Sequence, residues 1–168
     1  MKKQKGQAPR LLQKQQPIFG NDKGLQPGKI TMTLPNFTIA YWCVLVAAVL
    51  PIVCTGIAKY GMFGIAPAKG GYDNNNPRAW LLRQTDWRAR ANAAQANTFE
   101  ALPFFFAAVI IAHQLQARQT LLDILAFLVV VLRMVYVMSY VADMAKTRSA
   151  IWALAFALNI AILFVGHR

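Results

Sequence analysis

The sequence predicts an all-α membrane protein, a bundle of four transmembrane helices. Three observations predict this class: four long apolar runs, a charged fraction of 14%, and a positive mean hydropathy of +0.36. A soluble domain usually carries about 25% charged residues. With 57% hydrophobic residues and two cysteines in 168 residues, the chain is neither a disordered protein nor a disulfide scaffold.

The apolar runs are long enough to cross a bilayer. They lie at about residues 37–58, 91–114, 121–141 and 151–165. The second run holds one charge, Glu100, and the third holds Asp123 near one end and Arg133 near its middle. A hydrocarbon core of ~30 Å needs about 20 apolar residues per helix, which the fourth run reaches only with its flanks at 148–150 and 166–168. Long runs that do not alternate predict helices rather than transmembrane strands.

The connections between the runs are unequal in length. Short connections at residues 116–120 and 143–149 predict that the last three helices are antiparallel neighbours. The connection at 59–90 is long and contains the turn-forming stretch GGYDNNNP at Gly70–Pro77. We predict a flexible basic tail over residues 1–35 and a four-helix transmembrane domain over residues 36–168. Such a chain is an integral, multi-pass protein of the inner or plasma membrane in a bacterium, or of an organelle membrane in a eukaryote.

The formal net charge of +12, from 18 Lys+Arg against 6 Asp+Glu, favours either nucleic acid or a membrane surface as partner. The basic residues lie in the tail and loops without an identifiable nucleic-acid-binding module, so the expected partner is the lipid bilayer. Cys43 and Cys54 are roughly 16 Å apart along one helix, too far for a disulfide with each other. No cluster of cysteine and histidine exists in the sequence, and we expect no metal site.

Two charges lie inside the predicted spans, Glu100 and Arg133. A charge in the bilayer costs at least ~2.5 kcal/mol, so each needs a partner. Counted at 1.5 Å per residue from the same membrane face, their depths are roughly 14 and 15 Å, which predicts a contact within one chain or between chains. Asn97 shares a helical face with Glu100, and Pro103 removes a backbone donor and predicts a kink.

On the third helix, Arg133, Tyr136 and Tyr140 form one stripe at spacings of three and four. Arg148 and Ser149 begin the fourth helix on the same side of the membrane, with Ser149 expected as its N-cap. We therefore expect a cationic, donor-rich pocket for an anionic small molecule near the long connection. Its expected members are Arg88, Arg90, Gln95, Asn97, Glu100, Arg133, Tyr140, Arg148 and Ser149. A structural polar network that only fixes helix register is the alternative, and the residues alone leave both open.

The segment RARANAAQANTFEALPFF, Arg88–Phe105, carries the pattern Asn-x-x-Glu followed by proline at Asn97, Glu100 and Pro103. In this pattern the chain resembles the MAPEG family, the membrane-associated proteins of eicosanoid and glutathione metabolism. Glutathione-using members also carry arginine followed seven residues later by tyrosine, matched by Arg133 and Tyr140, and then Arg-Ser, matched by residues 148 and 149. The resemblance covers residues 36–168 and leaves the tail outside it.

The resemblance implies a homotrimer of four-helix bundles, with glutathione as cosubstrate between neighbouring subunits on the cytosolic side. It implies that Asn97, Glu100, Arg133 and Tyr140 bind glutathione. It also implies that Arg148 and Ser149 are the catalytic residues beside the thiol. A nearby guanidinium favours thiolate over thiol, and thiolate is the nucleophile.

The first expected function is a membrane glutathione-dependent transferase or peroxidase acting on small hydrophobic electrophiles. Glutathione-using members carry further Arg or His just before the Asn-x-x-Glu pattern, where this chain has Ala93, Ala94, Gln95 and Ala96. Those members have tyrosine where this chain has Trp152. These departures and the basic tail motivate the alternative, a non-catalytic accessory subunit of a larger membrane complex or a lipid-binding scaffold. A third hypothesis is a proton-coupled transporter with Glu100 as the relay.

Overall fold

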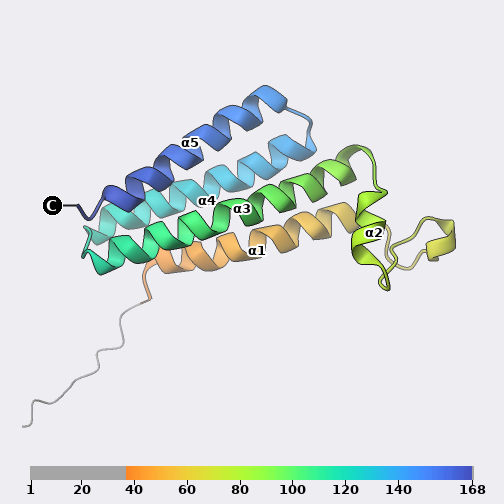
Figure 1. Cartoon of the computed structure of the whole chain (residues 1–168), viewed down its shortest axis with the longest axis horizontal. Coiled ribbons are helices and arrows are strands. Elements are labelled where there is room, and N and C mark those ends of the chain that lie inside the picture. Colours follow the sequence, from red (N-terminus) through yellow and green to blue (C-terminus); the bar gives the residue numbers. More distant parts are fainter. Residues whose placement is uncertain (1–36, 168) are drawn as a thin grey trace, which may run out of the picture. The chain divides into compact units, whose positions relative to one another are not determined.

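The computed structural model describes residues 37–167. Its elements in chain order are α1 (Ile39–Lys59), the 3₁₀ turn η1 (Pro67–Lys69), α2 (Pro77–Leu82), α3 (Asp86–Gln114), α4 (Gln119–Val141) and α5 (Ala145–Phe164). The four long helices run alternately back and forth along one bundle (Figure 1), which confirms the predicted all-α, four-helix class. The predicted tail over residues 1–35 lies outside the described residues, so its division from the bundle stays a prediction.

Each long helix meets the requirement for crossing a membrane. They contain 20 to 29 residues, and each holds an 18-residue window with a mean hydropathy between 1.4 and 2.4. At 1.5 Å per residue, even the 20 residues of α5 span about 30 Å. Two helices start earlier than the apolar runs predict: α3 at Asp86 rather than 91, and α5 at Ala145 rather than 148–151. The extra turns are polar, so hydropathy alone does not detect them.

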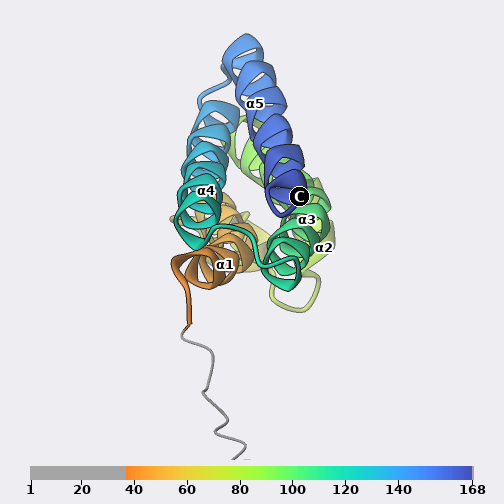
Figure 2. The same cartoon turned by 90° about the vertical axis from the view of Figure 1, so that its left-hand side faces the viewer.

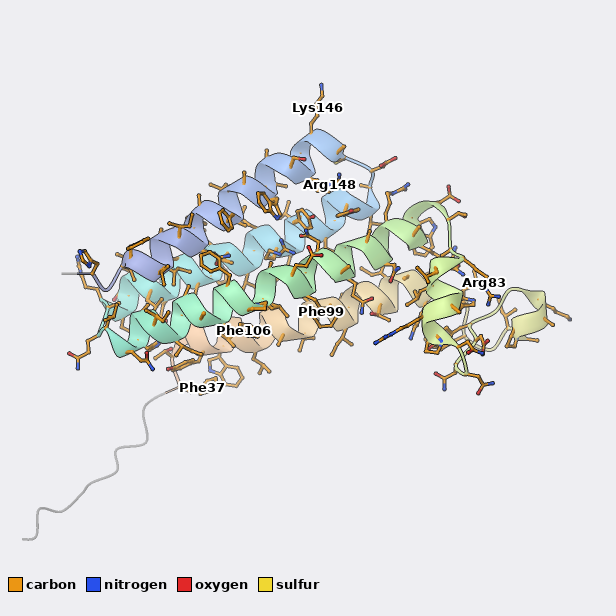
Figure 3. All side chains as sticks on the ribbon, viewed as in Figure 1. Phe37, Arg83, Phe99, Phe106, Lys146 and Arg148 are labelled. Carbon is orange, nitrogen blue, oxygen red and sulfur yellow. The ribbon has the colours of Figure 1, made fainter. Side chains whose placement is uncertain are left out.

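Helices α3 and α4 form the middle of the bundle, because each contacts both α1 and α5 (Figure 2). The buried positions shared by α1, α3 and α4 are largely small. They include Ala40, Ala47, Ala108, Ala112 and Ala126, all at most 3% exposed. Small side chains let helix backbones approach closely, which is how membrane helices associate when lipid is as apolar as the protein. Larger apolar side chains such as Phe99 are exposed on the outer surface (Figure 3), where a bilayer would contact them.

The bundle has two chemically different ends. We call the end where α1 begins and α5 finishes the tail-side end. The other end, which carries the long connection between α1 and α3 and the turn between α4 and α5, is the loop-side end (Figure 1). At the tail-side end, Asp123 of α4 accepts hydrogen bonds from the backbone N–H of Ala40 and from Gln119 Nε2, both at 2.8 Å. A carboxylate from one helix therefore caps the N-terminus of another, where the helix dipole favours negative charge.

A second polar group at the tail-side end joins α1 to α3. Thr38 accepts a hydrogen bond from the backbone N–H of Tyr41 at 3.3 Å, as the N-cap of α1. His113 places Nε2 at 3.1 Å from Thr38 Oγ1 and Nδ1 at 2.9 Å from the carbonyl oxygen of Val109. Since a carbonyl only accepts, Nδ1 carries the proton and Nε2 accepts from the threonine hydroxyl. Each of these groups thus has a partner within the chain.

The long connection at the loop-side end is folded. Tyr72 contacts the ring of Trp80 edge-on at 5.3 Å between centroids, and its hydroxyl accepts from Lys59 Nζ at 2.8 Å. A Cβ added to Gly71 would lie 1.9 Å from the carbonyl oxygen of Ile65, so only glycine fits there. The connection therefore has its own small core around Trp80, which is 3% exposed.

Candidate functional site

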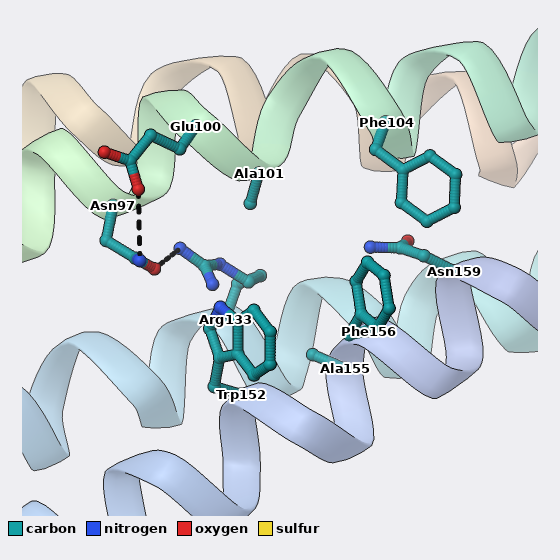
Figure 4. A pocket seen from close by; sticks show the side chains of 9 residues that line it. All are labelled: Asn97, Glu100, Ala101, Phe104, Arg133, Trp152, Ala155, Phe156 and Asn159. Atoms are coloured by element: carbon teal, nitrogen blue, oxygen red, sulfur yellow. Dashed lines mark hydrogen bonds between the residues drawn. The ribbon is translucent and has the colours of Figure 1, made fainter.

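Arg133 is the buried centre of the contact between α3 and α4. Its side chain is 6% exposed, and Nη2 donates to Asn97 Oδ1 and to Thr98 Oγ1, each at 3.2 Å. Asn97 Nδ2 in turn donates to Glu100 Oε2 at 3.4 Å (Figure 4). A fixed amide therefore connects the guanidinium to the carboxylate.

The predicted direct contact between Glu100 and Arg133 within one chain is therefore wrong. The depth estimate was close, but Glu100 lies on the exposed side of α3, and Asn97, one turn earlier, reaches Arg133 instead. Depth along a helix does not fix rotation about its axis, which changes by about 100° per residue. A contact between Glu100 and the arginine of another subunit stays a prediction.

A series of contacts between arginine and tyrosine side chains leads from Arg133 to the loop-side end. The Arg133 guanidinium carbon lies 4.5 Å from the centre of the Tyr136 ring, and the rings of Tyr136 and Tyr140 meet edge-on at 5.7 Å. The Arg148 guanidinium carbon then lies 4.2 Å from the centre of the Tyr140 ring. The first of these contacts lies within α4, and the second, Arg148 over the Tyr140 ring, joins α5 to α4 at this end. The predicted stripe on α4 thus joins Arg133 to Arg148.

Ser149 does not cap α5. The helix begins at Ala145 after a turn in which Asp143 has a φ of 62°, so Ser149 lies one turn inside it. Its hydroxyl is exposed and donates to the carbonyl oxygen of Ala145 at 3.1 Å. The N-cap prediction failed because the turn after α4 is short and helical geometry resumes at once. Arg148 is half-buried beside Ser149, and Lys146 projects away from the bundle (Figure 3).

Two arginines of the predicted pocket serve other contacts. Arg88 donates to the carbonyl oxygen of Tyr60 at 3.1 Å and lies over the ring of Trp87. Arg90 donates to the carbonyl oxygen of Val141 at 3.0 Å and forms an ion pair with Asp143 at 3.7 Å. Neither arginine lines the two cavities described next. Arg88 is bound at the end of α1, and Arg90 is bound at the end of α4 and the turn that follows it.

Of the remaining predicted residues, all but Gln95 line two neighbouring cavities. The polar cavity, of about 260 Å³, is lined by Asn97, Tyr136, Tyr140, Arg148, Ser149 and Trp152. The aromatic cavity, of about 170 Å³, is lined by Asn97, Glu100, Ala101, Phe104, Arg133, Trp152, Ala155, Phe156 and Asn159. Asn97 and Trp152 line both. The structure therefore gathers all six predicted site residues around adjoining spaces, while Gln95 lines neither.

Sequence reasoning missed the aromatic cavity. The rings of Trp152 and Phe156 stack at 5.4 Å with an angle of 4°, and Phe104 of α3 meets Phe156 at 5.5 Å. Asn159, 4% exposed, lies at the far end from Arg148. It is the one polar side chain between residues 150 and 164, and that signal was available in the sequence. Phe104 meets Phe156 only because α3 packs on α5, and the spacing of residues along the sequence does not predict that packing.

Four apolar helices around a buried polar site define an integral, multi-pass membrane protein. The sequence model of the MAPEG family matches residues 39–166, and the chain belongs to this family. The match spans all four long helices and both cavities. A search of curated proteins and a search of solved structures gave no significant match.

Proposed function

We propose that this protein is a membrane glutathione-dependent transferase or peroxidase that acts on small hydrophobic electrophiles. Its family is generally related to glutathione, which supports this class of cosubstrate. The observation that carries the proposal is Arg148, whose guanidinium is held 4.2 Å from the centre of the Tyr140 ring at the wall of the polar cavity. A fixed cation beside an open polar space is what a thiolate needs.

Glutathione has two carboxylates, an ammonium group and a thiol, and the two adjoining cavities together offer charged and neutral partners for such groups. Arg148 provides a cation, and Glu100, on the adjoining wall, provides a carboxylate for the ammonium group. Tyr140 and Asn97 provide neutral hydrogen-bonding groups. In this proposal Arg133 acts mainly as a positioning residue, because its donation fixes Asn97.

The chemical step requires a thiolate at neutral pH. A free thiol has a pKa of about 8.5, and lowering it to about 7 raises the thiolate fraction more than tenfold. We assign this effect to the Arg148 guanidinium. Ser149 already donates its single proton to Ala145, so it would turn that proton to the sulfur at the cost of one helix contact. The thiolate then attacks the electrophile, and the second substrate comes from the bilayer through the apolar side of the bundle.

Thermal unfolding of the detergent-purified protein with reduced glutathione tests the proposal. A ligand at ~100 times its dissociation constant stabilises the folded state by about 2.7 kcal/mol. We expect a saturable rise in the unfolding temperature, and its loss in Arg133→Leu, because Asn97 loses the donor that orients it. Lys146→Ala is the matched control, since this cation lies two residues from Arg148 and lines neither cavity. A well-folded wild type that shows no shift up to millimolar glutathione contradicts the proposal.

The alternative function, a non-catalytic accessory subunit or lipid-binding scaffold, is favoured by one observation. Arg88 and Arg90 precede Asn97 on α3, and they donate hydrogen bonds to the carbonyl oxygens of Tyr60 and Val141. Neither arginine lines the two cavities. Purification in a mild detergent followed by native electrophoresis separates the two functions. A stable larger complex without glutathione-dependent turnover supports the accessory function, whereas an isolated homotrimer with turnover supports the enzyme. The homotrimer itself stays a prediction from the family resemblance.

A further inference from the structure

The long connection between α1 and α3 keeps a positive charge of its own. It carries three cations, Lys69, Arg78 and Arg83, against the carboxylate of Asp73. All three cations are exposed. Within residues 37–167 no hydrogen bond or ion pair engages their side chains, whereas Asp73 accepts from two backbone N–H groups of its own turn. No described part of the chain therefore neutralises these cations.

Exposed apolar side chains lie on the same connection. Residues 61–68, GMFGIAPA, contain no charged, amide or hydroxyl side chain, and Phe63 and Ile65 among them are 65% and 40% exposed. On α2, Leu82 is 80% exposed. A single exposed apolar side chain needs no explanation, but several on one short segment indicate contact with lipid or with another protein.

Helix α2 has a buried side and an exposed side. Trp80 is buried, and its Nε1 donates to the carbonyl oxygen of Gly70 at 3.4 Å. Arg78 and Leu82, four residues apart, share the exposed side, and Arg83 follows directly. Figure 1 shows α2 lying across the direction of the long helices, at the loop-side end. Because the long helices cross the bilayer, α2 lies along its surface, as an interfacial helix does.

The length of α1 places this connection at the depth of the lipid headgroups. Its 21 residues span about 31 Å, close to the ~30 Å of the hydrocarbon core. With Ile39 at one edge of the core, Lys59 lies at the other. The residues that follow then enter the headgroup layer, which is about 5–7 Å thick on each side. Tyr60, the first of them, is exposed, as expected for an aromatic side chain at a membrane interface.

We propose that this surface of the connection binds anionic phospholipid headgroups in the leaflet at the loop-side end. The residues of this interfacial surface are Phe63, Ile65, Lys69, Arg78, Leu82 and Arg83. A guanidinium donates two parallel hydrogen bonds to a phosphate, and Leu82 lies among the upper parts of the acyl chains. Headgroup binding does not depend on the proposed function. A second protein is the other occupant for such a surface, but the charge and the depth both match anionic lipid.

Thermal unfolding of the full-length, detergent-purified protein with added dioleoylphosphatidylglycerol tests the role of the charge. The reference lipid is dioleoylphosphatidylcholine, which has the same acyl chains and no net charge. We expect saturable stabilisation by the anionic lipid. Each arginine near an anionic surface contributes a factor of about five, so the double variant Arg78→Gln with Arg83→Gln should weaken the apparent affinity about 25-fold. The matched control, Arg118→Gln with Lys146→Gln, removes the same charge from exposed positions outside the connection and should keep the affinity.

Three outcomes of this titration overturn the proposal. The first is equal stabilisation by the two lipids. The second is an equal loss of affinity in the two double variants, which would make the effect one of total charge. The third is equal protection by inorganic phosphate, which would make the surface a site for a free anion.

A fluorescent label measures the depth of the interfacial surface. Leu82→Cys is labelled with nitrobenzoxadiazole, which emits strongly in a membrane interface and weakly in water, and is reconstituted in vesicles of phosphatidylcholine and phosphatidylglycerol. The native Cys43 and Cys54 are buried and should stay unlabelled. We expect bright, blue-shifted emission from position 82. The control Asn75→Cys, on the exposed turn of the same connection, should give the emission of the label in water. Equal, water-like emission from both positions overturns the proposal and leaves the apolar side chains to a protein partner.

Discussion

The tail-side end and the interior of the bundle differ in how their buried polar groups are satisfied. At the tail-side end, Asp123, Thr38 and His113 find partners on neighbouring turns or helices. In the interior of the bundle, Arg133 and Asn159 each keep one buried atom without a partner, and both residues line the aromatic cavity. A third such atom is Nε of Arg88, beside the long connection. Satisfied groups of this kind hold helices in register, whereas each buried polar atom without a partner calls for an explanation of its own.

The largest expected effect concerns the loop-side end. Arg148→Ala should lower glutathione-dependent turnover by more than tenfold, because the thiol returns toward its ordinary pKa of about 8.5. Turnover is measured with a broad electrophile and with an organic hydroperoxide, at saturating glutathione. The bundle itself should unfold at nearly the wild-type temperature, since Arg148 is only half-buried. Turnover equal to that of Lys146→Ala would remove Arg148 from the chemistry.

The next effect concerns the tail-side end. Asp123→Ala removes the acceptor that caps α1, and loss of a capping group costs about 1 kcal/mol of stability. We expect a lower unfolding temperature with unchanged affinity for glutathione, measured in the same titration. Asp73→Ala is the control, because this carboxylate accepts only from the neighbouring loop residues 75 and 76. A loss of glutathione affinity in Asp123→Ala would break the division between a structural end and a ligand end.

Glu100→Gln should produce a smaller change. It removes a negative charge from the wall of the aromatic cavity but keeps an oxygen that can accept from Asn97. We expect roughly fivefold weaker glutathione binding, as for the loss of one partly exposed ion pair, and little change in stability. The same variant tests the transporter hypothesis. If Glu100→Gln abolishes substrate efflux in vesicles and leaves turnover unchanged, the result supports a proton relay instead.

Ser149→Ala should have the smallest effect. The hydroxyl donates to the carbonyl oxygen of Ala145, so its contribution to thiolate stabilisation is offset by the helix contact that it gives up. We expect a two- to threefold loss of turnover, roughly 0.5 kcal/mol, with Thr147→Ala on the same exposed turn as control. A loss as large as that of Arg148→Ala would instead make the hydroxyl an equal partner at the sulfur.

The sequence predicted the number, order and type of the long helices, because apolar runs of 15 to 24 residues carry that signal directly. It predicted poorly where two helices begin: the first turns of α3 and α5 are polar and look like connections. It also predicted the wrong partner for Arg133, because spacing gives depth along a helix but not which side chain of the turn faces the neighbour. The stripe of Arg133, Tyr136 and Tyr140 was predictable, since residues three and four apart share a face.

The spacing of residues along the sequence could not predict the contacts between different helices. The capping of α1 by Asp123 joins residues 83 positions apart, and the cation over Tyr140 joins α5 to α4. Asn159 is the instructive case between these extremes. Its isolation in an apolar run is visible in the sequence, whereas the unpartnered oxygen and the aromatic walls emerge only when α3, α4 and α5 are packed together.

The wall that Asn97 and Trp152 share separates a polar space near the loop-side end from an aromatic space deeper in the bundle. For the proposed enzyme, two reactants would then arrive from different phases, one from water and one from the hydrocarbon of the bilayer. The rate would follow the mole fraction of the apolar reactant among the lipids rather than its amount per volume of buffer. Diluting the membrane with inert lipid at constant bulk concentration would slow the reaction, although neither the protein nor its aqueous reactant had changed.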